Sequence, residues 1–318
     1  MARPTLTPAP PGGAIGTLAL GGQGGHLRTG VWRAVGGRGG VLLLGGRAEF
    51  IEKYHQTIGE LLGRGFDVFT FDWPGQGGSS RLLADPQKGH IGNFADYLAA
   101  LDRFIADVVT RRGPLYGLAH SMGAHCLLRY LHDRPGVIER VVCCATLAGL
   151  HLGAAQRLLC HLAVRAGLGK RYAPGQHPFN EADRRFANNR LTGDRARFDE
   201  YLAWLECKPG LQLGGVTWGW LDAALRSMAL INAPGYAEAV ETGVLMVRAG
   251  ADRVVSRSAQ ARLAARLPRA KMITLDGARH EILRETDDLR AAFWRAFDDF
   301  IPATPPSPEH APADRPPQ

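Results

Sequence analysis

The sequence predicts an α/β protein with a mostly parallel sheet flanked by helices and with one helical insertion. Two observations predict this fold class. Helix and strand patterns alternate along most of the 318 residues, and the alternation stops after Gly149 and returns near Gly235. Such alternation is typical of parallel sheets with helices on both faces. An apolar content of 45% is sufficient for a full hydrophobic core.

The first half of the chain begins with residues 1–13, which are rich in proline and glycine and which we expect to be disordered. Three short strand patterns follow, separated by glycine-rich turns that suit antiparallel pairing: 17–20, 29–35 and 41–44. The alternating part then predicts a helix over 49–62, a strand over 67–71, a helix over 94–109, a strand over 115–118, a helix over 124–131 and a strand within 137–145.

Residues 150–235 carry helical patterns with arginine, tryptophan and glycine but no further strand pattern, so we expect a helical cap inserted into a core formed by 14–149 and 236–301. The returning alternation predicts a strand over 243–249, a helix over 259–267, a strand over 271–275 and a closing helix over 288–300. Residues 302–318 are rich in proline, and we expect a disordered tail there.

Composition narrows the class of protein. The net charge is +8, but the basic residues are scattered and form no dense run, which argues against nucleic-acid binding. Attraction to anionic lipid surfaces and a simple bias toward arginine codons both explain this charge. The five cysteines lack C-x-x-C spacing and mostly lie in apolar runs, which favours buried reduced thiols over disulfides or metal ligands.

The amino-terminal sequence has no core typical of a signal peptide, and no apolar run approaches the ~20 residues of a membrane span. We therefore expect a cytoplasmic protein, with peripheral contact at the inner face of the membrane left open. The glycine-rich segments near Gly21 and Gly36 do not lie between a strand and a helix as a dinucleotide site requires. We expect no metal or organic cofactor, and the oligomeric state stays open.

A lone serine gives the clearest functional signal. Ser121 follows an apolar strand pattern and precedes a helix pattern, with small residues at Ala119 and Gly123, as in a nucleophile elbow. Small residues at these positions let the strand and the helix pass closely. The alternative is that Ser121 only caps the following helix.

A serine hydroxyl needs a neighbouring base and a carboxylate that orients it. Asp252 and His280 each follow a separate predicted strand, in the order serine, acid, histidine. We interpret Ser121 as nucleophile, Asp252 as acid and His280 as base. Asp252 as an ordinary turn or cap residue and His280 as a surface histidine are the alternatives.

The developing negative charge on a substrate also needs hydrogen-bond donors. We assign these to the backbone N–H groups of Met122, directly after the nucleophile, and of Arg47, in the loop after the third strand. Alternatively, Gly45 and Gly46 only shape a turn in that loop. Asp72, His90 and His120 are interpreted as structural hydrogen-bonding residues.

With these residues located, the chain resembles bacterial lysophospholipases of the monoacylglycerol-lipase-like branch of α/β-hydrolases. The resemblance rests on the nucleophile elbow and on four further stretches, 46–54, 71–81, 217–220 and 277–283. It departs at Gly45, where many relatives have His or Pro, and at Ala119 and Ala124, where many have Gly. It implies the α/β-hydrolase fold and a serine ester hydrolase with the insertion as a lid over an acyl pocket.

The resemblance implies that the substrate is a small-molecule lipid ester such as a lysophospholipid or monoacylglycerol. Only the insertion offers residues that could contact it. We expect Trp218, Trp220, Leu158 and Leu162 to contact it, although packing of the cap explains the same residues. Arg157, Arg165 and Arg171 are better explained as a solvated face than as phosphate ligands. Two rival functions remain: an acyltransferase that uses the same three residues, and a non-catalytic binding protein with this fold.

Overall fold

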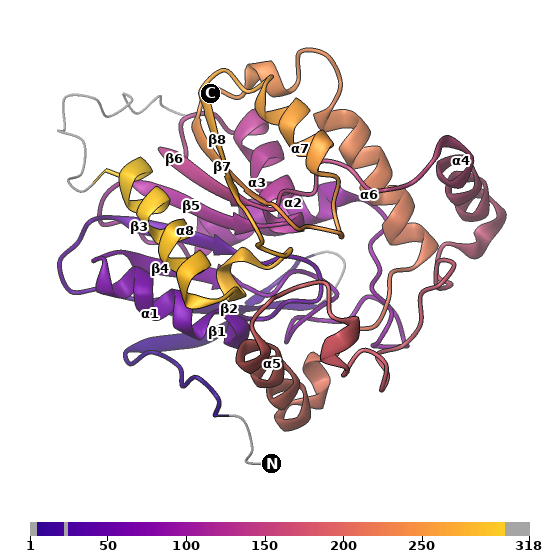
Figure 1. The fold of residues 1–318 in the computed structure, drawn as a ribbon, viewed down its shortest axis with the longest axis horizontal. Coiled ribbons are helices and arrows are strands. Elements are labelled where there is room, and N and C mark those ends of the chain that lie inside the picture. Colours follow the sequence, from indigo (N-terminus) through magenta and orange to yellow (C-terminus); the bar gives the residue numbers. More distant parts are fainter. Residues whose placement is uncertain (1–4, 22–24, 303–318) are drawn as a thin grey trace.

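The structure is a computed structural model, and it describes residues 5–21 and 25–302 (Figure 1). These residues form a sheet with the strand order β1-β2-β4-β3-β5-β6-β7-β8. Its strands are β1 (Gly13–Ala19), β2 (His26–Trp32), β3 (Gly40–Leu44), β4 (Asp67–Phe71), β5 (Leu115–His120), β6 (Arg140–Cys144), β7 (Gly243–Ala249) and β8 (Ala270–Leu275). Strands β3 to β8 run parallel, so their carboxyl ends share one edge of the sheet.

Antiparallel pairing at the start of the chain holds for β1 with β2, and β2 then pairs antiparallel with β4. The prediction was wrong for the third strand, because β3 lies parallel between β4 and β5 in the middle of the sheet. Every residue of β3 is buried. A strand that is covered on both faces fits the interior of a parallel sheet better than an amino-terminal hairpin.

Helices cover both faces of the sheet (Figure 1). One face packs on α2, α3, α6 and α7, and the other face packs on α1 and α8. The helices are α1 (His55–Gly63), α2 (Phe94–Asp107), α3 (Met122–Asp133), α4 (Ala154–Ala163), α5 (Arg195–Cys207), α6 (Trp218–Ile231), α7 (Arg257–Ala264) and α8 (Asp287–Phe300). Neighbouring residues of β3 alternate between the two cores, with Leu42 on the α2 side and Leu43 on the α1 side.

The helix expected over 49–62 begins later than predicted. Residues Ile51–Tyr54 form a 3-10 turn, η1, and α1 starts at His55. Glu49 does not join the helix, because its carboxylate accepts hydrogen bonds from the backbone N–H of Gly46 and from the hydroxyl of Tyr54.

The described part of residues 1–13, the segment expected to be disordered, makes two hydrogen bonds with the folded chain. The backbone N–H of Thr7 donates to Glu200 at 2.8 Å, and the indole of Trp32 donates to the carbonyl of Pro10 at 3.0 Å. A proline-rich composition gives no indication of hydrogen bonds to distant residues such as these. Most of the expected tail, residues 303–318, lies outside the described residues.

Between β6 and β7 the chain leaves the sheet. Along the chain it forms α4, a π-helical turn η2 (Val164–Leu168), a 3-10 turn η3 (Phe186–Asn188), α5, a 3-10 turn η4 (Pro209–Leu211) and α6. A further 3-10 turn, η5 (Ala237–Ala239), leads into β7. The last 3-10 turn, η6 (Ile282–Arg284), precedes α8. Figure 1 shows α4 and α5 at the margin of the molecule, whereas α6 packs in the main core with α2 and α3. No described helix is long and apolar enough to cross a membrane.

Candidate active site

Ser121 lies in the sharp turn between β5 and α3. Its φ of 51° and ψ of −111° are rare for a residue with a side chain. It stands at the N-cap position of α3, but its side chain makes no capping hydrogen bond. A Cβ on Gly123 would lie only 2.4 Å from the carbonyl oxygen of Gly45, so glycine lets α3 approach the loop after β3. The turn therefore leaves the hydroxyl free for another partner.

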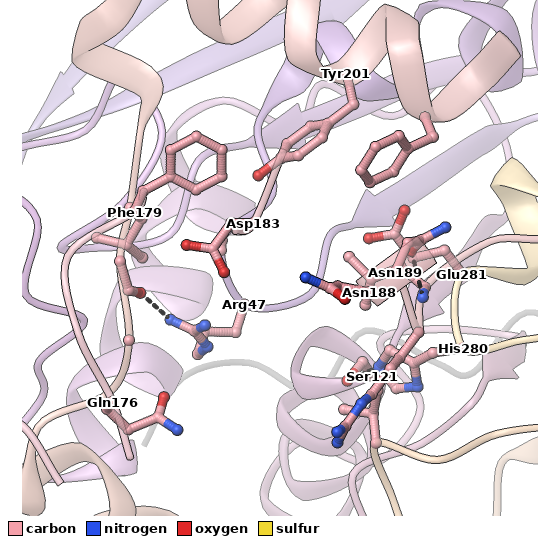
Figure 2. A pocket seen from close by; sticks show the side chains of 18 of the residues that line it. Arg47, Ser121, Gln176, Phe179, Asp183, Asn188, Asn189, Tyr201, His280 and Glu281 are labelled. Carbon is pink, nitrogen blue, oxygen red and sulfur yellow. Dashed lines mark hydrogen bonds between the residues drawn. The ribbon is translucent and has the colours of Figure 1, made fainter. Parts of the chain in front are cut away.

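That partner is His280, which follows β8. Its Nε2 lies 3.0 Å from Ser121 Oγ, and Figure 2 shows these two side chains together. Its Nδ1 lies 2.8 Å from Asp252 Oδ2. All three side chains are buried. Because a carboxylate only accepts hydrogen bonds, Nδ1 carries a proton and donates it to Asp252, which leaves Nε2 to accept from the serine hydroxyl. The structure thus brings the three predicted residues together.

Asp252 also holds a turn in place, which is the role given above as the alternative to catalysis. Its Oδ1 accepts the backbone N–H of Val254 at 2.7 Å and of Val255 at 3.2 Å, which fixes the carboxylate while Oδ2 faces His280. It does not cap α7, because Ser256 does. Burial alone would raise the pKa of Asp252, but the hydrogen bond and charge of His280 and the two N–H groups lower this pKa below its ordinary value.

The loop after β3 is held firmly against Ser121. A Cβ on Gly46 would lie 3.2 Å from the Cβ of Ser121. Gln76 donates to the carbonyl of Gly46 at 2.8 Å and accepts the N–H of Ala48 at 3.2 Å. The N–H of Arg47 has no acceptor within the part of the chain that the structure describes. The N–H of Met122 is in the first turn of α3 and lacks an intrahelical acceptor.

His120 contacts the backbone of His280, the residue interpreted as the base. Its Nε2 lies 3.0 Å from the carbonyl oxygen of His280, and its Nδ1 lies 3.0 Å from the carboxylate of Glu49. Both neighbours accept hydrogen bonds, which requires both ring nitrogens to carry protons. Burial lowers the pKa of His120, but the charge and hydrogen bond of Glu49 outweigh burial and raise this pKa overall. His120 is therefore a buried imidazolium that positions His280.

Replacing His120 with glutamine is expected to lower the free energy of unfolding by about 2 kcal/mol at pH 6, as for the loss of a charge-assisted hydrogen bond. Folding raises the pKa of His120, so its stabilisation is complete below the unfolded pKa of about 6.5 and is lost as the pH rises through the folded pKa. Urea unfolding at pH 6 and pH 9 tests this. A destabilisation that is independent of pH would contradict the charged state of His120. The exposed His151→Gln is the control and should leave the free energy of unfolding unchanged.

Two cavities meet at Ser121. The apolar cavity has a volume of about 520 Å³ and is lined by Leu147, Leu150, Leu159, Val216, Trp218 and Trp220 among others. The polar cavity has a volume of about 380 Å³, and its lining includes Gln176, Asp183, Asn188, Asn189 and Tyr201 (Figure 2). Arg47, Gln176 and Arg190 line both cavities. The site therefore offers an apolar and a polar space that both reach the same hydroxyl.

Comparison with known proteins assigns the family. A profile described as serine aminopeptidase, S33, matches residues 37–287. The chain belongs to the serine aminopeptidase S33 family. This S33 chain is also 32% identical over 275 residues to lysophospholipase L2 of Escherichia coli K12, a match that covers 82% of this chain and 79% of that protein. A probable lysophospholipase L2 of Haemophilus influenzae is 29% identical over 265 residues and covers 82% of this chain and 83% of its own.

Solved structures agree on the fold of this S33 chain. A monoglyceride lipase of Saccharomyces cerevisiae has a TM-score of 0.71 at 18% identity and covers 91% of this chain and 96% of its own. A monoacylglycerol lipase of Paleococcus ferrophilus has a TM-score of 0.67 at 22% identity and covers 87% and 98%. The α/β-hydrolase fold and the resemblance to lysophospholipases and monoacylglycerol lipases are confirmed.

The expected substrate residues of the S33 chain divide into two groups. Trp218 and Trp220 line the apolar cavity, although Trp220 also packs on Phe94 and donates to Tyr97 at 3.3 Å. Leu158 and Leu162, which are 59% and 52% exposed on α4, do not line it. The neighbouring Leu159 lines it instead, although it is 54% exposed itself. Helical spacing identified the apolar turns of α4 but not the side that faces the cavity.

Other lining residues of the S33 site were missed or misjudged. Arg47 was chosen for its backbone N–H, but its side chain also enters both cavities. Arg190 gave no sequence signal, because only the folded insertion brings it to Ser121. Arg157, Arg165 and Arg171 are exposed and line neither of these two cavities, although Arg157 lines a third one. In the described ranges, no group of three or more His, Cys, Asp or Glu side chains could hold a metal.

Proposed function

We propose that this chain is a carboxylic ester hydrolase of lipid esters, most closely a lysophospholipase, that works through an acyl-enzyme on Ser121. The observation that carries the proposal is the hydrogen-bonded series Ser121, His280 and Asp252 at the junction of an apolar and a polar cavity. Lysophospholipase L2 of Escherichia coli, by its name, acts on lysophospholipids, and its similarity over most of both chains favours the same substrate class.

In the proposed reaction His280 Nε2 takes the hydroxyl proton as Ser121 Oγ attacks the ester carbonyl. The N–H groups of Arg47 and Met122 hold the oxyanion. His280 then gives its proton to the departing glycerol oxygen. Water, activated in turn by His280, attacks the acyl-enzyme and releases the fatty acid. The charge of Asp252 stabilises the imidazolium formed in each half of the reaction.

We propose that residues 150–235 act as the cap of this site, with the acyl chain in the apolar cavity. Leu159 on α4 and Trp218 on α6 both come from this segment and line that cavity. A panel of p-nitrophenyl esters, a lysophospholipid and a monoacylglycerol tests the function. The wild type is expected to release fatty acid from both lipids, and no turnover of any of these esters would contradict the proposal.

We further propose that the exposed side of α4 meets the lipid surface that supplies the substrate. Leu158 and Leu162 are both more than half exposed on this helix, and the chain carries a net charge of +8. The double substitution Leu158→Ser with Leu162→Ser is expected to lower the bound fraction several-fold in co-sedimentation with anionic phospholipid vesicles. The matched change Leu82→Ser, at an exposed leucine elsewhere, is the control. An equal loss in both proteins would contradict this surface.

A further inference from the structure

The guanidinium of Arg47 lacks the partner that a charged side chain near a protein interior normally has. Arg47 is partly buried and lines both cavities at Ser121. Its Nη1 donates to the carbonyl of Gly214 at 2.9 Å, and no carboxylate of the described residues pairs with it. A guanidinium has five N–H donors, so most of its capacity faces the cavities.

Two other arginines near the interior are paired with carboxylates, whereas the buried Arg129 and the half-buried Arg81 contact only hydroxyl or carbonyl oxygens. Arg28 contacts Glu52 and Asp72, each at 2.7 Å, and Arg284 contacts Glu200 at 2.9 Å. Such pairing is the rule because an unpaired charge is costly to remove from water. Arg47 has no such partner and, unlike Arg129 and Arg81, it lines both cavities at Ser121. Its positive charge is therefore available to a bound anion.

A second unpaired arginine adds to the positive charge at the polar cavity. Arg190 lines both cavities, is exposed and also has no ion-pair partner within the described ranges. Lys53, by contrast, is neutralised by Glu281 at 2.7 Å and by Glu49 at 3.2 Å. The two guanidinium groups thus make the junction of the cavities a positive region.

We propose that Arg47, assisted by Arg190, binds the phosphodiester of a lysophospholipid headgroup in the polar cavity while the acyl chain occupies the apolar cavity. This inference rests on the proposed function. A planar guanidinium fork matches two phosphate oxygens, which makes arginine well suited to this role.

The covalent structure of the substrate fits this division. In a lysophospholipid the ester carbonyl lies between the acyl chain and the glycerol, and the phosphate is attached at the other end of that glycerol. With the carbonyl at Ser121 and the chain in the apolar cavity, the polar cavity is the space at Ser121 that is left for the phosphate. Asp183 faces that space beside Tyr201 and Phe179 (Figure 2). Its carboxylate suits the ammonium group of a zwitterionic headgroup. The same carboxylate repels a headgroup that carries further negative charge.

The test compares two substrates with the same acyl chain, lysophosphatidylcholine and monoacylglycerol. The readout is the ratio of their kcat/KM values, because damage to the oxyanion donor at residue 47 lowers both values by the same factor and cancels. Arg47→Met is expected to lower this ratio on the order of 10- to 100-fold, and Arg47→Lys less. Arg190→Met is expected to lower it up to about 5-fold, as for an exposed charge. Arg111→Met, at an exposed position before β5, should keep the wild-type ratio.

Competition separates a lipid headgroup from free phosphate as the ligand. With a p-nitrophenyl ester as substrate, glycerophosphocholine should inhibit the wild type more strongly than inorganic phosphate, and Arg47→Met should weaken that inhibition. Stronger inhibition by inorganic phosphate would overturn the headgroup assignment. An unchanged ratio in Arg47→Met, with both lipids hydrolysed by the wild type, would overturn the role of Arg47 alone. A wild type that hydrolyses neither lipid would overturn the proposed function as well.

Discussion

Replacing Ser121 with alanine is expected to lower kcat on the order of 10⁶-fold, the effect of removing a serine nucleophile that acts with a histidine base. The physical reason is the loss of the atom that forms the acyl-enzyme. Neither His280 nor the oxyanion donors can supply a substitute, because the hydroxyl of Ser121 is the group within 3.0 Å of His280 Nε2. Fatty-acid release from lysophosphatidylcholine at saturating substrate measures the effect.

Two controls make the result of Ser121→Ala interpretable. The exposed Ser258→Ala should retain wild-type activity. The far-ultraviolet circular dichroism spectrum of Ser121→Ala should match that of the wild type, because the change removes one oxygen and leaves the turn in place. A folded Ser121→Ala protein that retains more than about a hundredth of the wild-type kcat would exclude the acyl-enzyme mechanism, since loss of the nucleophile costs far more than that.

The second large effect is expected for Asp252→Asn, on the order of a 10⁴-fold loss in kcat. The amide oxygen can still accept the N–H groups of Val254 and Val255, so the turn should survive. The amide nitrogen would then face His280 Nδ1 as a donor and would favour the tautomer with the proton on Nε2. In that tautomer His280 cannot accept the proton of Ser121.

Asp276→Asn is the matched control, because Asp276 is exposed just after β8 and makes no contact with the ring of His280 within the described residues. The control should retain wild-type kcat. A loss of less than about tenfold in Asp252→Asn would be far below the effect of a mispositioned base and would show that Asp252 does not orient His280.

Local patterns predicted much of this protein because they depend on neighbouring residues. The strands at 67–71 and 243–249 have the bounds that their apolar runs indicated. The order of Ser121, Asp252 and His280 after separate strands was sufficient to predict their meeting, because carboxyl ends of parallel strands share one edge.

The remainder depends on contacts between distant residues. The central position of β3 is decided by its pairing with β4 and β5, which its own residues do not reveal. The arrival of Arg190 at Ser121 and the choice of Leu159 over Leu158 depend on how the insertion folds back over the sheet. The docking of Thr7 on Glu200 joins residues 193 positions apart.

Labelling with a fluorophosphonate tests the central claim most directly, because this reagent reacts with a serine only when a neighbouring base and oxyanion donors activate it. The labelled protein is digested, and mass spectrometry locates the adduct. We expect one adduct on Ser121 in the wild type, none in Ser121→Ala and much slower labelling in Asp252→Asn. A wild type that stays unlabelled, or that carries its adduct on another serine, would contradict the account.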